Sequence, residues 1–161
     1  MNRKMQKPLV VLALIATLFA SMARPAYAVF DKIRFATDLG VAFFAFHHWV
    51  YKPYKEGAFA AGAPHRTKAM LKGGAALLFT LNRLKAANNI VHTTNDPLLK
   101  KIGASLDRVT SSFSSVGTDL KAGKFKPEDL SGMDGNINNV ISGAGNAGIK
   151  VKDVPVEIPN S

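Results

Sequence analysis

The chain has 161 residues, of which 47% are hydrophobic, and its 21 Lys and Arg against 11 Asp and Glu give a formal net charge of +10. This apolar fraction is typical of a folded chain and excludes global disorder, and the length suits a single domain. Because the chain has no cysteine, disulfides, iron–sulfur clusters, cysteine-ligated zinc, thiol nucleophiles and covalently attached haem are excluded.

Residues 1–28 have the features of a secretory signal peptide. A positively charged start precedes an apolar run over residues 9–23, and an A-x-A cleavage signature ends at Ala28. The apolar run is short for a membrane span, so we expect cleavage after Ala28. Retention as an uncleaved anchor is the alternative. The sequence therefore predicts a secreted or extracytoplasmic protein whose mature chain covers residues 29–161.

The first predicted helix of the mature chain covers residues 31–51 and is apolar nearly all round, which is typical of a helix buried on several sides. We expect it to stop before Pro53, because the residue that precedes a proline avoids the α-helical region. On its surface, Arg34 and Asp38 are four residues apart and are predicted to form an ion pair. A loop rich in Gly and Pro then leads to Pro64.

The second predicted helix runs from Pro64 or His65 to about His92, since proline suits the first helical turn. Gly73 and Gly74 lie inside it, and each costs about 1 kcal/mol relative to alanine. We expect another helix, the aromatic first one, to approach closely at these glycines; a kink or a tolerated cost is the alternative. The predicted apolar face of this helix consists of Met70, Leu71, Leu77, Leu78, Leu81, Leu84 and Ile90.

The third predicted helix has the clearest pattern. Asp96 is a good N-cap, Pro97 fits the first helical position, and Gly123 can end the helix. Apolar residues recur at alternating spacings of three and four, which is typical of a seam between packed helices. Because the flanking positions are not densely charged, we expect packing within one chain rather than a dimeric coiled coil. The seam residues are Leu99, Ile102, Leu106, Val109, Phe113, Val116 and Leu120.

The fourth predicted helix covers residues 127–147 and contains several glycines, which lower its stability. Gly148 is expected to cap it. Residues 143–148 spell G-x-G-x-x-G, but a dinucleotide-binding fingerprint needs a preceding strand and a following crossover helix. The few residues that remain cannot supply these elements, so we expect a glycine-rich helix end, followed by an extended or partly disordered tail over residues 149–161.

Short connections favour antiparallel neighbours, so the predicted fold is all-α: an up-down-up-down four-helix bundle over residues 29–148. In this topology the ends of the first and third helices share one pole with the starts of the second and fourth. Cations gather there around aromatic side chains, among which Phe59 is also expected to be exposed. We call the following set the basic pole: Tyr51, Lys52, Tyr54, Lys55, Arg66, Lys68, Lys121, Lys124 and Lys126. The same segments carry four acids: Glu56, Asp119, Glu128 and Asp129.

Clustered cations with exposed aromatic side chains suit an anionic surface. The sequence therefore predicts a basic, non-enzymatic binding protein of the cell envelope, whose partner is an anionic envelope polymer or phospholipid headgroups. Plain solvated helix ends are the alternative. No specific nucleic acid is expected, because no recognition motif is present. No cofactor is expected, and the Ser and Thr residues at positions 110–115 of the third helix have no His or Asp at a spacing that suggests catalysis.

Two rival functions remain open. In one, the protein is membrane-active, and its first helix leaves the bundle to lie in a bilayer interface. In the other, His47 and His48 bind a metal ion or a non-covalent haem. Adjacent residues on a helix point about 100° apart, so these two histidines do not readily hold one ion together. His65 comes near one of them if the first two helices are antiparallel.

Overall fold

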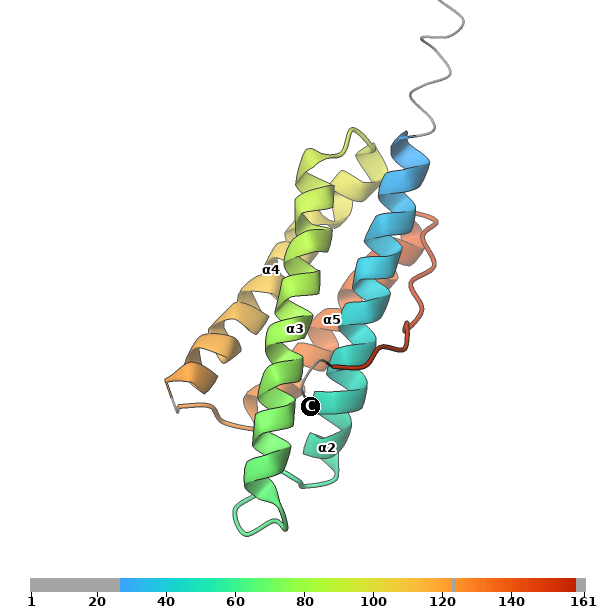
Figure 1. Cartoon of the computed structure of the whole chain (residues 1–161). Coiled ribbons are helices and arrows are strands. Elements are labelled where there is room, and N and C mark those ends of the chain that lie inside the picture. The colour runs from blue at the N-terminus through green and yellow to red at the C-terminus, as the bar shows by residue number, and fades with distance from the viewer. Residues whose placement is uncertain (1–26, 123, 159–161) are drawn as a thin grey trace, which may run out of the picture.

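The computed structural model of the chain describes residues 27–122 and 124–158, and every regular element in these ranges is a helix. The predicted all-α helical bundle is therefore confirmed (Figure 1). Most of the predicted signal peptide, up to residue 26, lies outside the described residues, as does Gly123, the predicted end of the third helix.

The first helix is longer than predicted. Its α-helical part covers residues 27–46 and continues through a π-helical turn, η1 (His47–Tyr51), into α2 (Lys52–Lys55). The prediction that the helix stops before Pro53 is wrong. The amide of Lys52 donates to the carbonyl of His47, five residues back. This wider turn puts Pro53 among the first residues of a new α-helical segment, where its missing N–H is tolerated.

The three long helices that follow lie close to their predicted positions. They are α3 (Arg66–Thr93), α4 (Pro97–Lys121) and α5 (Asp129–Asn146). α3 packs against η1 and α4, and α4 packs against α5. Figure 1 shows the α2–α3 loop and the α4–α5 connection towards the lower end of the bundle. The α3–α4 turn lies at the upper end, beside the start of the first helix.

The predicted seam of α4 lies in the middle of the core. Leu99 and Leu106 are fully buried, and Phe113 is only 1% exposed. The rings of Phe113 and Phe46 meet edge to face with their centroids 5.2 Å apart, which ties α4 to the first helix. The seam is thus buried within one chain, as predicted.

The apolar face of α3 was predicted only in part. Leu77 and Leu84 are buried, but Leu71 and Leu78 are exposed. The inward surface of α3 instead includes small residues such as Ala76 and Ala87. Because these side chains are small, neighbouring elements can come close to this surface of α3. Leu71 and Leu78 lie on an adjacent surface of the helix and are exposed.

Gly73 and Gly74 do mark a close approach, as expected, but not of the first helix. A Cβ atom at Gly73 would lie 2.9 Å from the ring of Phe59, and one at Gly74 would lie 2.8 Å from a methyl group of Leu120. The partners are therefore the α2–α3 loop and α4. Phe59 is buried by this contact, so the prediction that it is exposed among the cations is wrong.

Residues 149–158 form neither helix nor strand and lie against the first helix. Gly148 has a φ of 74°, and the amide of Ile149 donates to the carbonyl of Ala144 at 2.9 Å, so the predicted glycine cap of α5 is confirmed. Further along, the amide of Val154 donates to the carbonyl of Gly40 at 3.0 Å. The absence of a side chain at Gly40 is what lets this segment approach the helix backbone.

Adding a methyl group at Gly40 should displace residues 149–158. In Gly40→Ala the Cβ atom would overlap the carbonyl oxygen of Lys152 and lie 2.8 Å from a methyl group of Val154. Because one obstacle is backbone, we expect a loss of about 1–3 kcal/mol in the free energy of unfolding. Amide hydrogen exchange should show faster exchange at Val154.

Gly132→Ala is the matched control for this change, because a Cβ atom there meets nothing within 4 Å. Replacing an exposed helical glycine should stabilise the chain by about 0.5–1 kcal/mol. Unchanged protection of the Val154 amide in Gly40→Ala would mean that the segment can shift without leaving the first helix.

Candidate functional site

The cations of the basic pole are open to solvent wherever the structure describes their side chains. Six of these cations have a described side chain, and none of the six forms an ion pair with a described carboxylate. Two of them lie in α2, two at the start of α3 and two in the α4–α5 connection, and Figure 1 places these segments towards the lower end of the bundle. The backbone of Lys121 ends α4, and its side chain lies outside the described part. The six are Lys52, Lys55, Arg66, Lys68, Lys124 and Lys126.

The aromatic residues of the basic pole are half-buried and support the cations. The ring of Tyr51 stacks on Phe46 with centroids 5.7 Å apart, and the Nζ of Lys55 lies 6.0 Å from the centroid of the Tyr51 ring. Tyr54 lies beside Tyr51, with ring centroids 6.2 Å apart. A cation over an aromatic face is attracted by the ring quadrupole, so Lys55 is held near the surface that Tyr51 forms.

The α2–α3 loop is tied down by one of the pole's own cations. The Nε of Arg66 donates to the carbonyl of Phe59 at 2.9 Å. Because Phe59 is buried against Gly73, this bond fixes the loop on the start of α3. This is the hydrogen bond that the Arg66 side chain makes within the described residues, and it uses one of the five N–H donors of the guanidinium.

The acids of these segments do not neutralise the described cations by direct contact. Asp119 and Asp129 line a groove between α4 and α5, together with Ser112 and Asn136. Of the four acids predicted near the pole, none forms an ion pair with a described cation. Six cations and three acids, Glu56, Glu128 and Asp129, are exposed in these segments, so the described cations outnumber the exposed acids.

His47 has a role that the sequence did not reveal. Its Nε2 lies 3.4 Å from an oxygen of Asp134 on α5, and its Nδ1 lies 3.2 Å from an oxygen of Asp153. When the ring is protonated, both nitrogens donate. His47 thus links η1 to α5 and to the segment that follows α5. Neither aspartate could be paired with His47 from sequence spacing, because both contacts are made through tertiary packing.

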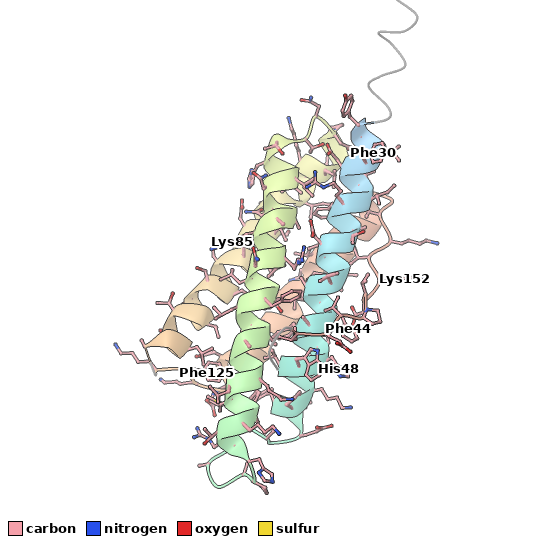
Figure 2. All side chains as sticks on the ribbon, in the orientation of Figure 1. Phe30, Phe44, His48, Lys85, Phe125 and Lys152 are labelled. Atoms are coloured by element: carbon pink, nitrogen blue, oxygen red, sulfur yellow. The ribbon has the colours of Figure 1, made fainter. Side chains whose placement is uncertain are left out.

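The other two histidines of the predicted metal set lie apart from this contact. His48 stacks on Phe44 with ring centroids 5.1 Å apart, and both are labelled on the first helix in Figure 2. His65 precedes α3 with a left-handed φ of 55°. No hydrogen bond or ring contact in the described part of the chain joins two of the three histidines. Within the same residues, no group of three His, Asp or Glu side chains is placed to hold a metal ion.

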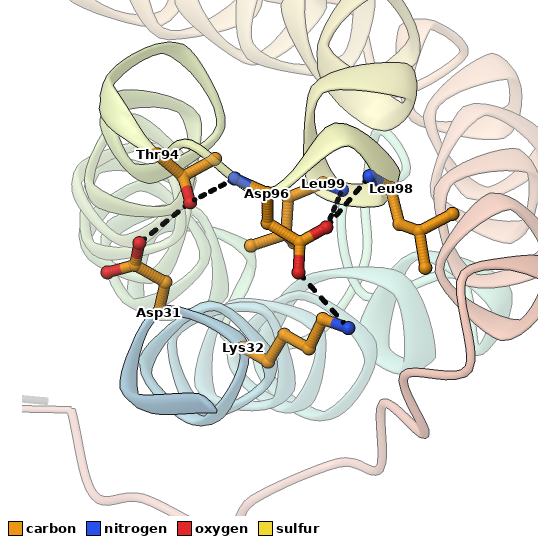
Figure 3. A network of polar contacts seen from close by, with 6 residues as sticks. All are labelled: Asp31, Lys32, Thr94, Asp96, Leu98 and Leu99. Carbon is orange, nitrogen blue, oxygen red and sulfur yellow. Dashed lines mark hydrogen bonds and ion pairs between the residues drawn. The ribbon is translucent and has the colours of Figure 1, made fainter. Parts of the chain in front are cut away.

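At the upper end, a polar network joins the first helix to the α3–α4 turn (Figure 3). The hydroxyl of Thr94 donates to Asp31 at 2.7 Å, and the amide of Asp96 donates to the Thr94 oxygen at 3.1 Å. The Nζ of Lys32 lies 3.1 Å from the second oxygen of Asp96. The sequence indicated the capping role of Asp96 but not its partners on the first helix.

Asp96 also caps α4 as predicted. One carboxylate oxygen accepts from the amides of Leu98 and Leu99 at 2.8 and 3.3 Å. Burial alone would raise the pKa of Asp96, but the hydrogen bonds from Lys32 and from these two amides lower it below its ordinary value of 3.8.

Ion pairs between helices replace the predicted pair within the first helix. Asp38 pairs with Arg83 of α3, with 3.5 Å between Oδ1 and Nη1, and not with Arg34. The prediction was wrong because Asp38 lies at the contact with α3, where a partner from another helix is available. On α4, the hydrogen bond with His92 and then that from Asn88 lower the pKa of Asp107.

Comparison of the chain with models of protein families, with curated proteins and with solved structures finds no match. Among the described helices, none combines the length and the apolar character that crossing a membrane requires.

Proposed function

We propose that this is a small exported protein, not an enzyme, which uses the basic pole to bind phosphate-bearing anions of the cell envelope, either a polymer or phospholipid headgroups. The observation that carries the proposal is the set of six exposed cations without a carboxylate partner. Exposed charges are screened over about 8–10 Å at physiological salt, so only clustered cations produce a useful field.

The proposal includes two finer features of the fold: the up-down-up-down order of the helices and an extended C-terminal tail. The position of the α2–α3 loop and the α4–α5 connection in Figure 1 supports the helix order. That order brings Lys52 and Lys55 to the same end as Lys124 and Lys126. The hydrogen bond from Val154 to Gly40 supports a tail that lies along the bundle.

Export is the second part of the proposal and rests on the N-terminal sequence. The charged start, the apolar run over residues 9–23 and the A-x-A signature support cleavage after Ala28. Intact-mass analysis of the exported protein should give a chain that begins at Val29. A secreted chain that still begins at Met1 would contradict this part and leave the basic pole unaffected.

The basic pole is tested by changing Lys52, Lys55, Lys124 and Lys126 together to Gln. Polyphosphate coupled to a resin is a suitable probe, because it has no apolar part. We expect the wild type to be retained at low salt and released as salt rises, since contacts with polyanions release counterions. The quadruple variant should elute much earlier, with an unchanged helical circular dichroism spectrum.

A control variant loses the same net charge at sites outside the basic pole. It separates the effect of clustered cations on retention from the effect of the protein's overall net charge. Lys85, Arg108, Lys150 and Lys152 are exposed and lie outside the basic pole. Their joint replacement by Gln should change the elution salt concentration much less. Equal losses in the two variants, or no retention of the wild type at low salt, would leave the cations of the lower end as solvated helix ends.

A further inference from the structure

The opposite end of the bundle has exposed apolar side chains. Val29, Phe30 and Ile33 on the first helix are 55%, 64% and 57% exposed. Ile33 follows Phe30 by three residues and Val29 by four, so it is a neighbour of each on the helix surface, and Figure 2 shows Phe30 at the upper end. Leu98, at the start of α4, is also exposed. We call Val29, Phe30, Ile33 and Leu98 the upper apolar face.

The concentration of apolar side chains at this end is not a general property of the surface. Seven large hydrophobic residues are exposed in the described part of the chain; one of them, Tyr27, precedes the proposed cleavage site, and four of the remaining six form the upper apolar face. The other two, Leu71 and Leu78, lie along α3. Contiguous exposed apolar residues mark an interaction surface more often than scattered ones do.

Near the upper apolar face, the cations and the acids differ in whether they have a partner. Arg34, Lys100 and Lys101 are exposed and form no ion pair with a described carboxylate. In contrast, the carboxylates of Asp31 and Asp96 are engaged by the Thr94 hydroxyl and by Lys32. The cations without an ion pair thus lie on the same two helices as the upper apolar face, within a few residues of it in the sequence, and cations beside apolar side chains suit anionic lipid.

The position of this face in the chain also favours a bilayer. Only residues 24–26 separate the apolar run over residues 9–23 from the described first helix. A segment of that kind enters the bilayer during export, so the residues that follow it are brought to the membrane surface. A phospholipid bilayer is thus close to the upper apolar face when the protein is exported.

We propose that the upper apolar face inserts into the interface of an anionic phospholipid bilayer, with Arg34, Lys100 and Lys101 at the headgroups. Each lysine near an anionic surface strengthens binding about fivefold. The bundle stays folded, because Phe35 and Phe43, which the first helix would have to expose on leaving it, are fully buried in the core. The proposal does not rest on the basic pole, which lies towards the other end.

The test is flotation with vesicles of phosphatidylglycerol and phosphatidylcholine. The protein is expressed with its own N-terminal segment, and the exported chain that intact-mass analysis shows to begin at Val29 is used, because a retained apolar run over residues 9–23 would bind vesicles by itself. Phe30→Ser combined with Ile33→Ser should weaken binding about tenfold or more. Leu71→Ser combined with Leu78→Ser removes exposed apolar side chains elsewhere and should change binding less than about twofold. Vesicles of phosphatidylcholine alone should bind the wild type far more weakly.

Two further measurements separate this proposal from its rivals. The single tryptophan, Trp49, lies near Lys72, with Nζ 5.8 Å from the ring centroid. Its emission should not change on binding, whereas it would change if the first helix left the bundle. The variant in which Lys52, Lys55, Lys124 and Lys126 are Gln should keep its dependence on the upper apolar face.

Unchanged flotation of the Phe30 and Ile33 variant, measured on the chain that begins at Val29, would overturn the proposal. Equal losses in the two double variants would do the same. A wild type that is dimeric in solution, with a monomeric Phe30 and Ile33 variant that still floats normally, would instead show that the face joins two copies of the chain.

Discussion

Replacing Phe113 with alanine should lower the free energy of unfolding by about 3–5 kcal/mol. The side chain is 1% exposed and packs edge to face on Phe46, with 5.2 Å between the ring centroids. Truncation would leave a cavity between α4 and the first helix, where the surrounding side chains cannot fully relax. Such a loss is a large share of the stability of a domain of this size.

Denaturant titration monitored by circular dichroism would measure this loss. Ser111→Ala is a suitable control, because Ser111 is exposed two residues away on the same helix, and it should change stability by less than about 0.5 kcal/mol. A loss under about 1 kcal/mol for Phe113→Ala would mean that the seam of α4 is not part of a tightly packed core.

Asp96→Ala should have the second largest effect on stability, a loss of about 2 kcal/mol. The change removes the acceptor for the Leu98 and Leu99 amides and leaves Lys32 without its carboxylate partner. Asn95→Ala, next to it in the exposed turn, is the control and should be nearly neutral. Thermal unfolding of both variants at neutral pH would compare them directly.

The same carboxylate makes stability depend on pH in the acid range. The pKa of Asp96 is lower in the folded chain than its ordinary value of 3.8, and the pKa of Asp107 is lowered as well. The unfolded chain therefore binds more protons, so stability rises with pH in this range. The stability that these two carboxylates contribute is fully present when the pH is above their ordinary pKa. It is lost as the pH falls through their lowered pKa in the folded chain.

Asp96→Asn separates the charge from the cap, because an amide oxygen can still accept from the helix amides. We expect this variant to lose less stability than Asp96→Ala at neutral pH. Its stability should also fall less than that of the wild type between about pH 5 and pH 2. An identical acid profile in the two proteins would mean that Asp96 carries no pH-dependent stability.

Local patterns explain why some elements could be predicted from sequence. The seam and N-cap of α4 depend on spacing within one helix and on a capping residue directly before it. The π-helical turn before Pro53 has no comparable sequence signature, so the first helix was predicted to end too early. The burial of Phe59 depends on the open backbone at Gly73, which only the tertiary structure reveals.

In the candidate sites, too, the features that depend on local sequence were predicted, and those that depend on tertiary packing were not. The cations of the basic pole were predicted because they lie at helix ends, where exposure follows from the topology. The contact of Asp31 with Thr94 joins residues 63 positions apart, and that of His47 with Asp153 joins residues 106 apart. Periodicity cannot predict such pairs. The upper apolar face was missed because only Ile33 belonged to the predicted first helix, which was expected to be buried on several sides. Val29 and Phe30 precede the predicted start of that helix, and Leu98 lies outside the predicted seam of α4.

The hydrogen bond between Val154 and Gly40 also affects the order in which the fold is completed. The first helix is synthesised early, but its surface at Gly40 is covered by residues from the opposite end of the chain. Loop closure over such a distance is entropically costly and follows contacts of lower sequence separation. The helices can therefore associate first, while the surface around Gly40 stays hydrated until residues 149–158 pack onto it. A chain truncated at Gly148 would lose Ile149 and Ile158, which are buried in the core, together with the segment that covers Gly40.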